Sequence, residues 1–295
     1  MLDKSQSTSS SATHSGWNSN RSWRKFVRHK PALFGLAIII LLVLVATFAP
    51  IIAPFEYDVQ DFSSIRLSPS ANHLFGTDKY GRDVFSRVVY GSRIALMVSA
   101  LVVIIELVVG ITLGMLAGYF GGKVDMLISS FTDMVWAFPP LILALGIISA
   151  IGTGLVNVVI AIAISSWAPF ARVTRAKVLS IKELEFIEAG VAIGETDFNI
   201  LFRYLLPTVI APNLVLATLT IPAAILTTSS LSFLGFGAQP PSPDWGAILN
   251  EGREFLRDAW WISTFPGLAI LVTTLAFNFL GDGLRDVFDP KQTVQ

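Results

Sequence analysis

The chain has 295 residues, of which 53% are hydrophobic and 14% are charged, and its mean hydropathy is +0.65. Soluble domains carry about a quarter charged residues, so this composition excludes an ordinary water-soluble protein and favours lipid as the solvent. The 21 basic and 21 acidic residues balance to a formal net charge of zero, which argues against a nucleic-acid partner. Without cysteine the chain has no disulfide, thiolate metal site or catalytic thiol.

The first part of the chain combines a polar segment, a basic cluster and an apolar run. Residues 5–20 are rich in Ser, Thr and Asn without an apolar period, so we expect 1–30 to form a disordered, basic tail. From 32 to 55 there is no charged residue. This run is longer than the apolar region of a signal peptide, and no small-residue cleavage site closes it. We therefore predict an uncleaved first span at 32–54.

Five more apolar segments predict spans, since about 20 residues cross a bilayer. The uncharged stretch 134–171 is long enough for two of them with a turn at 152–154, and the Gly- and Pro-rich 231–243 predicts re-entrant or loop structure. The predicted spans are 94–118, 134–151, 155–171, 208–230 and 260–281. Residues 31–290 are thus predicted to form an all-α polytopic membrane bundle of six transmembrane helices, followed by a tail at 291–295.

Basic residues indicate which side of the membrane holds the chain ends. Six spans place both termini on one side, and most of the 21 basic residues lie in the two tails, near 123 and within 172–203. The positive-inside rule therefore predicts a multi-pass protein of the inner or plasma membrane with both termini in the cytoplasm.

The polar segment 172–207, between the fourth and fifth predicted spans, predicts two short helices joined by a turn. Ser180 and Glu183 have the spacing of a capping box. Three apolar residues share one face of the helix that follows: Leu184, Ile187 and Val191. Gly194 can end that helix in a left-handed conformation, and Thr196 can cap the next one. Such a segment suits either an amphipathic element on the lipid headgroups or a docking element.

The same segment resembles the EAA loop of bacterial ABC importer permeases. The matching residues are Glu188, Ala189, Gly190, Gly194, Leu206 and Pro207. The family pattern has Ala where this chain has Gly190, and usually an aliphatic residue where it has Tyr204. The resemblance implies that 172–207 couples the chain to a separate ATPase subunit, whose surface groove holds the helix around Glu188.

Four further segments resemble the dipeptide, oligopeptide and nickel subfamily of these permeases, of the DppC/OppC type. They are HLFGTD with GRD within 73–83, AGYFGG at 117–122, GFGAQPP at 235–241 and GDGLRD at 281–286. The resemblance implies one half of a translocation pathway for di- or oligopeptides or nickel complexes. Its implied partners are a second homologous permease subunit, two ABC ATPase subunits or domains, an extracytoplasmic solute-binding protein and membrane lipid.

ATP binding and catalysis by this chain itself are not expected. A P-loop is missing, because Lys123 is followed by Val124 and position 117 is Ala where the pattern needs Gly. The resemblance implies that ATP and Mg are used by partner subunits, and that this chain is a non-catalytic subunit without a cofactor or metal. An intramembrane protease lacks support, since no H-E-x-x-H motif is present. An autonomous secondary carrier, the main alternative, would need no cytoplasmic docking segment.

Four charged residues are candidate contact sites, each with two alternatives. Glu106 lies in mid-span, where an ionisable side chain costs about 2.5 kcal/mol or more unless it faces protein or water. It is either a substrate or proton contact, or a protonated or hydrogen-bonded residue between helices. Asp78, Arg82 and Asp83, in the first external loop, either contact a docked binding protein or pair with one another in a turn.

Small and aromatic residues carry two further predictions. Three glycines recur at every fourth position of the second span: Gly110, Gly114 and Gly118. This spacing predicts close packing against another helix. Three tryptophans lie near the start of the last span: Trp245, Trp260 and Trp261. We expect them to anchor the chain at the membrane interface.

Overall fold

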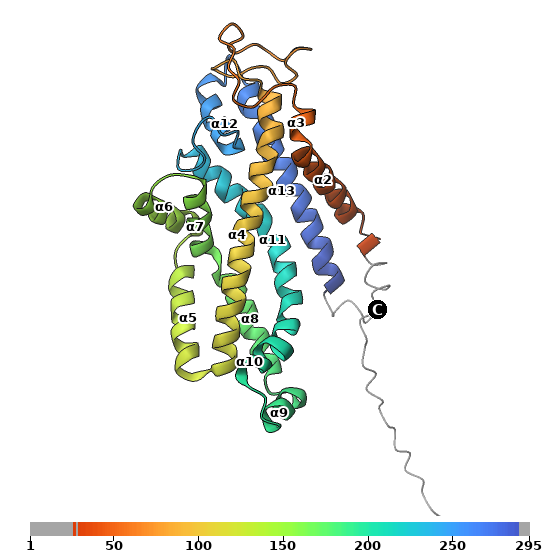
Figure 1. The fold of residues 1–295 in the computed structure, drawn as a ribbon, viewed down its shortest axis with the longest axis vertical. Helices are drawn as coiled ribbons and strands as arrows, with labels where there is room; N and C mark the ends of the chain where they lie inside the picture. The colour runs from red at the N-terminus through yellow and green to blue at the C-terminus, as the bar shows by residue number, and fades with distance from the viewer. Residues whose placement is uncertain (1–25, 28, 289–295) are drawn as a thin grey trace, which may run out of the picture.

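The computed structural model describes residues 26, 27 and 29–288. The predicted tail at 291–295 and nearly all of the predicted tail at 1–30 lie outside these residues. In the described part, helices pack side by side along one long axis (Figure 1). In chain order they are α2 (Lys30–Thr47), α3 (Ala49–Ile52), α4 (Val84–Phe120), α5 (Gly122–Trp136), α6 (Pro140–Ile151), α7 (Leu155–Ser166), α8 (Ala168–Ile181), α9 (Glu185–Ala192), α10 (Asp197–Asn199), η1 (Ile200–Leu205), α11 (Leu206–Phe233), α12 (Trp245–Gly252), η2 (Arg253–Phe255) and α13 (Trp261–Phe288).

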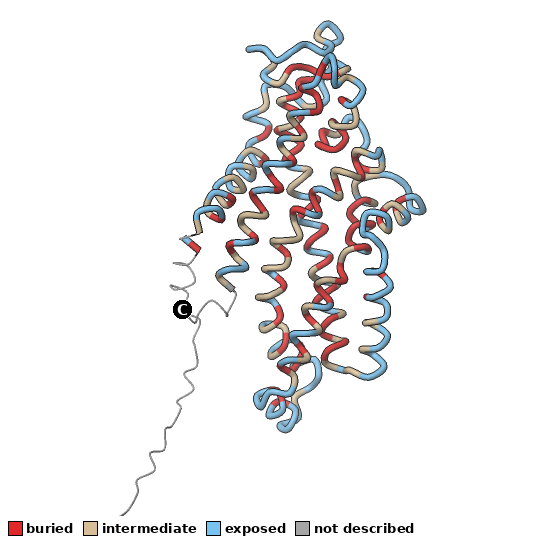
Figure 2. The backbone as a smooth tube through the Cα atoms, turned by 180° about the vertical axis from the view of Figure 1, so that it is seen from behind, coloured by how far each residue is buried: buried red, intermediate tan, exposed pale blue. Residues whose placement is uncertain are grey.

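The number of candidate spans agrees with the sequence. Within the described residues, five helices are long and apolar enough to cross a membrane, and one bent helix pair raises the number to six at most. The predicted all-α polytopic bundle is therefore confirmed. Buried residues follow the inner sides of the helices, whereas α5 and the end that carries α9 are largely exposed (Figure 2).

The second span is longer than predicted. Helix α4 has 37 residues, or about 55 Å at 1.5 Å per residue, against a hydrocarbon core of about 30 Å. It begins at Val84 because Asp83 is its N-cap and accepts a hydrogen bond from the Ser86 amide at 2.7 Å. One end of α4 therefore extends past the hydrocarbon core into the loop that precedes it.

The structure replaces the straight span predicted at 134–151 with a bent pair. Helices α5 and α6 meet at 93°. Pro139 and Pro140 lie at the bend, where proline removes the amides that a continuous helix would need. Helix α6 has only 12 residues, about 18 Å, which is too short to cross a bilayer alone. The turn predicted at 152–154 is present, with φ of 95° at Gly152 and 130° at Gly154.

Helices α4 and α8 approach closely through the predicted glycine stripe. Gly110, Gly114 and Gly118 all face α8. An added Cβ would lie 2.3 Å from Phe170 Cβ at Gly110 and 2.5 Å from the Ala171 carbonyl oxygen at Gly114. Real side chains do not tolerate such separations, so the close packing predicted from the spacing is confirmed. It joins α4 to the helix that leads directly into the 172–207 segment.

Candidate functional site

Residues 172–207 form a projection at one end of the molecule (Figure 1). Helices α7 and α8 together make one candidate span, which ends at Ile181. The chain then passes through α9, α10 and η1 before α11 begins at Leu206. The opposite end of the molecule holds α12 and the loop between α3 and α4. The segment that the sequence singled out is thus a tip, joined at both sides to spans.

The turn after α9 is fixed by the backbone. The amide of Gly194 donates to the Val191 carbonyl at 3.0 Å, and the amide of Glu195 donates to the Gly190 carbonyl at 3.1 Å. These are the two hydrogen bonds of a Schellman motif, which needs a left-handed residue, and Gly194 has φ of +83°. Thr196 then caps α10 through its side chain. The glycine turn and the threonine cap are confirmed.

The capping box predicted at Ser180 and Glu183 is wrong. Ser180 lies inside α8, and its hydroxyl donates to the Lys177 carbonyl at 2.7 Å. Helix α9 begins later, after Leu184, which makes no side-chain cap. The residues before Lys182 are mostly good helix formers, so α8 runs through the predicted boundary.

One side of α9 is anchored and the other is exposed. Ile187 is 3% exposed and packs in a cluster with Ile200 and Leu205. Leu184 and Val191, predicted to share its face, are instead 45% and 56% exposed. The short helix therefore holds to the bundle by a single apolar residue, and its other apolar side chains face outwards.

The predicted coupling residues divide between the surface of the tip and its base. Glu188 and Ala189 are exposed on α9, whereas Gly190 is buried and faces Tyr204, with 3.9 Å between an added Cβ and Tyr204 Cζ. At the base, the partly buried Leu206 and the exposed Pro207 open α11. Proline is tolerated in a first helical turn, where the amide has no helical partner.

The base of the tip contains a π-helix, η1, of six residues. Such segments are rare and occur frequently at functional sites. Leu205, its last residue, is fully buried. The tip is therefore connected to the fifth span through a packed irregular helix rather than through a loose loop.

Polar contacts tie the neighbouring helices to the tip. Both carboxylate oxygens of Asp125 on α5 accept hydrogen bonds from Arg175 on α8, at 2.5 and 2.6 Å. The Tyr119 hydroxyl at the end of α4 donates to Asp197 Oδ1 on α10 at 2.7 Å. Polar contacts therefore join α5 to α8 and α4 to α10 near the 172–207 segment.

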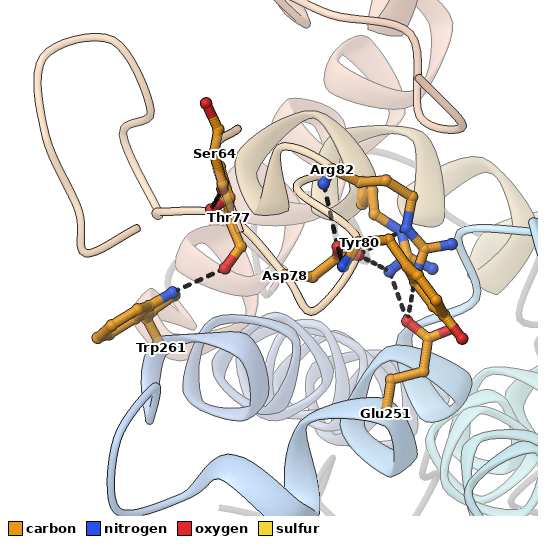
Figure 3. A network of polar contacts seen from close by, with 8 residues as sticks. Ser64, Thr77, Asp78, Tyr80, Arg82, Glu251 and Trp261 are labelled. Atoms are coloured by element: carbon orange, nitrogen blue, oxygen red, sulfur yellow. Dashed lines mark hydrogen bonds and ion pairs between the residues drawn. The ribbon is translucent and has the colours of Figure 1, made fainter. Parts of the chain in front are cut away.

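Four charged side chains form a buried cluster at the opposite end (Figure 3). Arg82 Nε and Arg87 Nη1 each lie 2.6 Å from Asp78 Oδ2. Arg82 Nη2 and Arg87 Nη1 lie 2.6 and 2.7 Å from Glu251 Oε2. Two positive charges thus compensate two negative charges, as burial of ionised groups requires. Asp83 has separate partners, because besides capping α4 it lies 2.9 Å from His73 Nδ1.

Asp78 and Arg82 pair with each other in the turn, whereas Asp83 pairs with His73. The exposed fractions of Asp78, Arg82 and Asp83 are 0%, 1% and 3%, so the three side chains are buried within this chain, and contact with a docked binding protein stays a prediction. Sequence reasoning missed Arg87 and Glu251. Arg87 lies nine residues from its partner Asp78 and 164 residues from its partner Glu251, so no local pattern connects it with either.

Helix α12, which carries Glu251, is held by buried polar contacts. Asp244 caps it by accepting a hydrogen bond from the Ala247 amide at 3.0 Å, and burial raises the pKa of the Asp244 carboxyl above its ordinary value. Trp245 and Trp261, expected at the membrane interface, are 2% and 6% exposed. Trp261 Nε1 donates to the Thr77 carbonyl at 3.1 Å (Figure 3). Interface anchoring is therefore wrong for these two residues, which hold the external end together.

Glu106 lies inside the bundle beside a cavity of about 220 Å³. Its side chain is 1% exposed, and its Oε2 has no hydrogen-bond partner in the described part of the chain. The missing partner of Oε2 does not decide between the two alternatives, a substrate or proton contact and a protonated or hydrogen-bonded residue between helices, so both stay predictions. Glu106 faces a space that Trp136, Phe138 and Ser165 also line.

Comparison with known proteins agrees with this geometry. A family described as binding-protein-dependent transport system inner membrane component matches residues 110–294, and one described as the N-terminal TM domain of oligopeptide transport permease C matches residues 19–69. Over 270 residues the chain is 44% identical to the dipeptide transport system permease protein DppC of Alkalihalophilus pseudofirmus, covering 92% of this chain and 89% of that protein. It is 45% identical, over 91% and 89%, to the glutathione transport system permease protein GsiD of Escherichia coli O157:H7.

A solved structure shares the fold. The MetNI methionine ABC transporter, in inward-facing conformations, contains a chain that matches with a TM-score of 0.54 and 22% identity. The match covers 70% of this chain and 98% of that chain. At this identity the likeness is evidence of the fold alone.

The fold defines a polytopic membrane protein, and the family match makes it a component of a transport system. Since the matched family model covers more than half of the chain, the class can be made specific. The chain belongs to the family of binding-protein-dependent transport system inner membrane components. It is the non-catalytic, multi-pass, inner-membrane permease of an ABC importer, and the ATP is used by ATPase subunits of the same complex.

Proposed function

We propose that the chain forms half of the translocation pathway of a peptide importer and is driven by an ATPase subunit that binds α9. The names of the relatives support this substrate class, because they refer to dipeptide and glutathione transport. In this proposal a second homologous permease supplies the other half, and an extracytoplasmic binding protein delivers the peptide. The α9 tip and both termini lie in the cytoplasm, in agreement with the distribution of basic residues.

The exposed surface of α9 is the observation that carries the proposal. Around the exposed Glu188, three apolar side chains face outwards: Phe186 at 45%, Val191 at 56% and Ile193 at 76% exposed. Exposed apolar side chains on a projecting helix suit docking into a groove on a partner. Ile187 and the Schellman turn hold α9 on the bundle, so a displacement of α9 is transmitted to α8 and α11.

Co-purification with the ATPase subunits tests the docking surface. Val191→Asp and Glu188→Lys are expected to reduce the ATPase retained with the solubilised permease and to lower peptide uptake about tenfold or more, because central interface contacts are worth about 2 kcal/mol or more. Lys123→Ala is the control, since Lys123 is exposed on the neighbouring helix α5. Peptide transport by the purified chain without any ATPase would support an autonomous carrier and contradict the proposal.

A further inference from the structure

The cavity beside Glu106 contains a buried carboxylate, and no basic side chain among the described residues lines it. Glu106 is the single acidic residue of α4, and its Oε2 is without a hydrogen-bond partner among the described residues. An ionised carboxylate in an apolar interior is costly unless it is paired. No Lys, Arg or His lines the cavity in the described part of the chain. Arg172 lies over the ring of Trp136, but it is not part of the cavity lining, and its Nη2 is paired with Asp133 Oδ1 at 2.7 Å.

The bend between α5 and α6 forms part of the cavity wall. Trp136, Phe138 and Pro140 belong to both the bend and the lining. Irregular backbone at membrane depth is tolerated where it lines a cavity, and broken helices form substrate sites in many transporters. The 93° bend is therefore a second feature, independent of Glu106, that points to ligand binding at this place.

Four hydroxyl residues line the cavity besides Glu106: Ser165, Ser166, Thr220 and Thr227. The Ser165 hydroxyl donates to the Ile162 carbonyl at 2.9 Å, and the Thr220 hydroxyl donates to the Leu216 carbonyl at 2.8 Å. Since each of these two hydroxyls uses its single donor within its own helix, its oxygen can only accept in the cavity. An unpaired carboxylate surrounded by hydroxyl oxygens that can accept suits a group that has several donors, no acceptor and a positive charge. A primary ammonium group has this chemistry.

We propose that this cavity is a subsite of the translocation pathway for the free ammonium group of the transported peptide. The inference rests on the proposed peptide import, and dipeptides and glutathione all carry such a group. Phe138, which is 51% exposed, and the exposed Ala223 border the cavity where it meets the surface. The aromatic face of Phe138 favours an approaching cation. The cavity has a volume of about 220 Å³, whereas one water molecule occupies about 30 Å³ in the liquid. The cavity therefore has room for a group larger than a water molecule.

Uptake by the complete importer, reconstituted in liposomes with its binding protein, tests the subsite. Glu106→Gln keeps the shape and removes the charge, and it is expected to lower glycylglycine uptake about tenfold, since a hydrogen bond to a charged group is worth about 1.5–3 kcal/mol. Glu106→Asp should restore part of the uptake. Thr112→Val is the control, because Thr112 lies on the same helix but is exposed and bonded to Val108. Wild-type uptake by assembled Glu106→Gln importer overturns the subsite, whereas absence of uptake in the wild type overturns the proposed function.

A second measurement detects occupation of the cavity without transport. In membranes that contain the assembled importer but no binding protein, dicyclohexylcarbodiimide is expected to modify Glu106, as seen by the mass of the α4 peptide. Glycinamide should slow the total modification of Glu106 several-fold, counted as the dicyclohexyl acylurea together with the glycinamide amide that forms when the amine displaces dicyclohexylurea, and N-acetylglycinamide at the same concentration should not. Equal protection by both compounds, protection by neither, or failure of Glu106 to react overturns the subsite.

Discussion

At the scale of single residues, the buried charge cluster explains how a polar loop is held on a membrane bundle. Asp78 and Arg82 come from the loop, Arg87 from α4 and Glu251 from α12, so the cluster joins three parts of the chain. Burial of four charges is costly, and the cost is offset only when every charge keeps its partner. Removal of one charged side chain from the cluster should therefore lower the free energy of unfolding more than removal of an exposed arginine.

Arg87→Met tests this dependence. The variant leaves Asp78 and Glu251 buried with one cation between them, and we expect a loss of about 3–5 kcal/mol in the free energy of unfolding. Denaturation of the purified protein in detergent measures it. Arg253→Met is the matched control, because Arg253 is exposed on η2 near the same end. Similar losses in both variants would mean that the cluster has no special role.

Substitution by alanine is expected to have opposite effects on the stability of the tip at its two glycines, Gly194 and Gly190. Gly194→Ala places a side chain at φ +83°, which costs about 1–2 kcal/mol. Gly190→Ala, in helical backbone with 3.9 Å to the nearest outside atom, should stabilise α9 by about 0.5–1 kcal/mol. Hydrogen exchange of the amides in 185–195 of the isolated permease compares them. A change in the same direction for both would contradict the Schellman turn as the determinant of tip stability.

At the scale of elements, the contact of α4 with α8 connects the tip to the interior. Helix α8 leads into α9, while α4 carries Glu106, and the glycine stripe brings the two helices together. Residues Ala168 and Pro169 of α8 line the same cavity as Glu106. A movement of α9 that displaces α8 therefore acts on the wall of the cavity as well as on the tip.

Gly114→Leu tests the packing of these two helices. The new side chain would begin 2.5 Å from the Ala171 carbonyl oxygen, so we expect a loss of about 1–3 kcal/mol in stability and lower uptake even in a folded importer. Gly146→Leu on α6 is the control, because an added Cβ there meets nothing within 4 Å. Thermal unfolding and uptake assays of both variants give the comparison, and equal tolerance would argue against tight packing.

At the scale of the whole molecule, the two ends have different constructions. One end is a short exposed tip on α9, and the other is a loop closed by buried charges and tryptophans (Figure 1). The bundle between them exposes apolar side chains such as Phe34 and Leu127 at 61% and 68%, which suits contact with lipid. Because the two ends differ, labelling each end separately can show which of them faces the cytoplasm.

Single cysteines can report the orientation because the natural chain has none. Ser68→Cys and Glu183→Cys replace exposed residues at the two ends. An impermeant thiol reagent added to intact cells, with the outer membrane permeabilised where one is present, is expected to label the first variant and not the second. Opened membranes should allow labelling of both. The reverse pattern would place the α9 tip outside the cytoplasm.

Local and periodic features could be predicted from the sequence alone. Apolar length revealed the helical bundle, the spacing of Gly110, Gly114 and Gly118 revealed a close helix contact, and Gly194 revealed the turn after α9. Each of these signals arises from neighbouring residues in the chain. The capping box at Ser180 failed because local spacing cannot show that α8 continues through it.

The sequence by itself determined the helical membrane bundle, the close helix contact and the turn after α9, because hydrophobic length, glycine spacing and turn chemistry are local. Only the tertiary structure decided that α5 and α6 bend, that Arg87 meets Glu251 and that Glu106 faces a cavity. These features depend on which distant helices pack together. Burial and pairing of a charge are properties of that packing, and a residue's neighbours in the chain do not specify them.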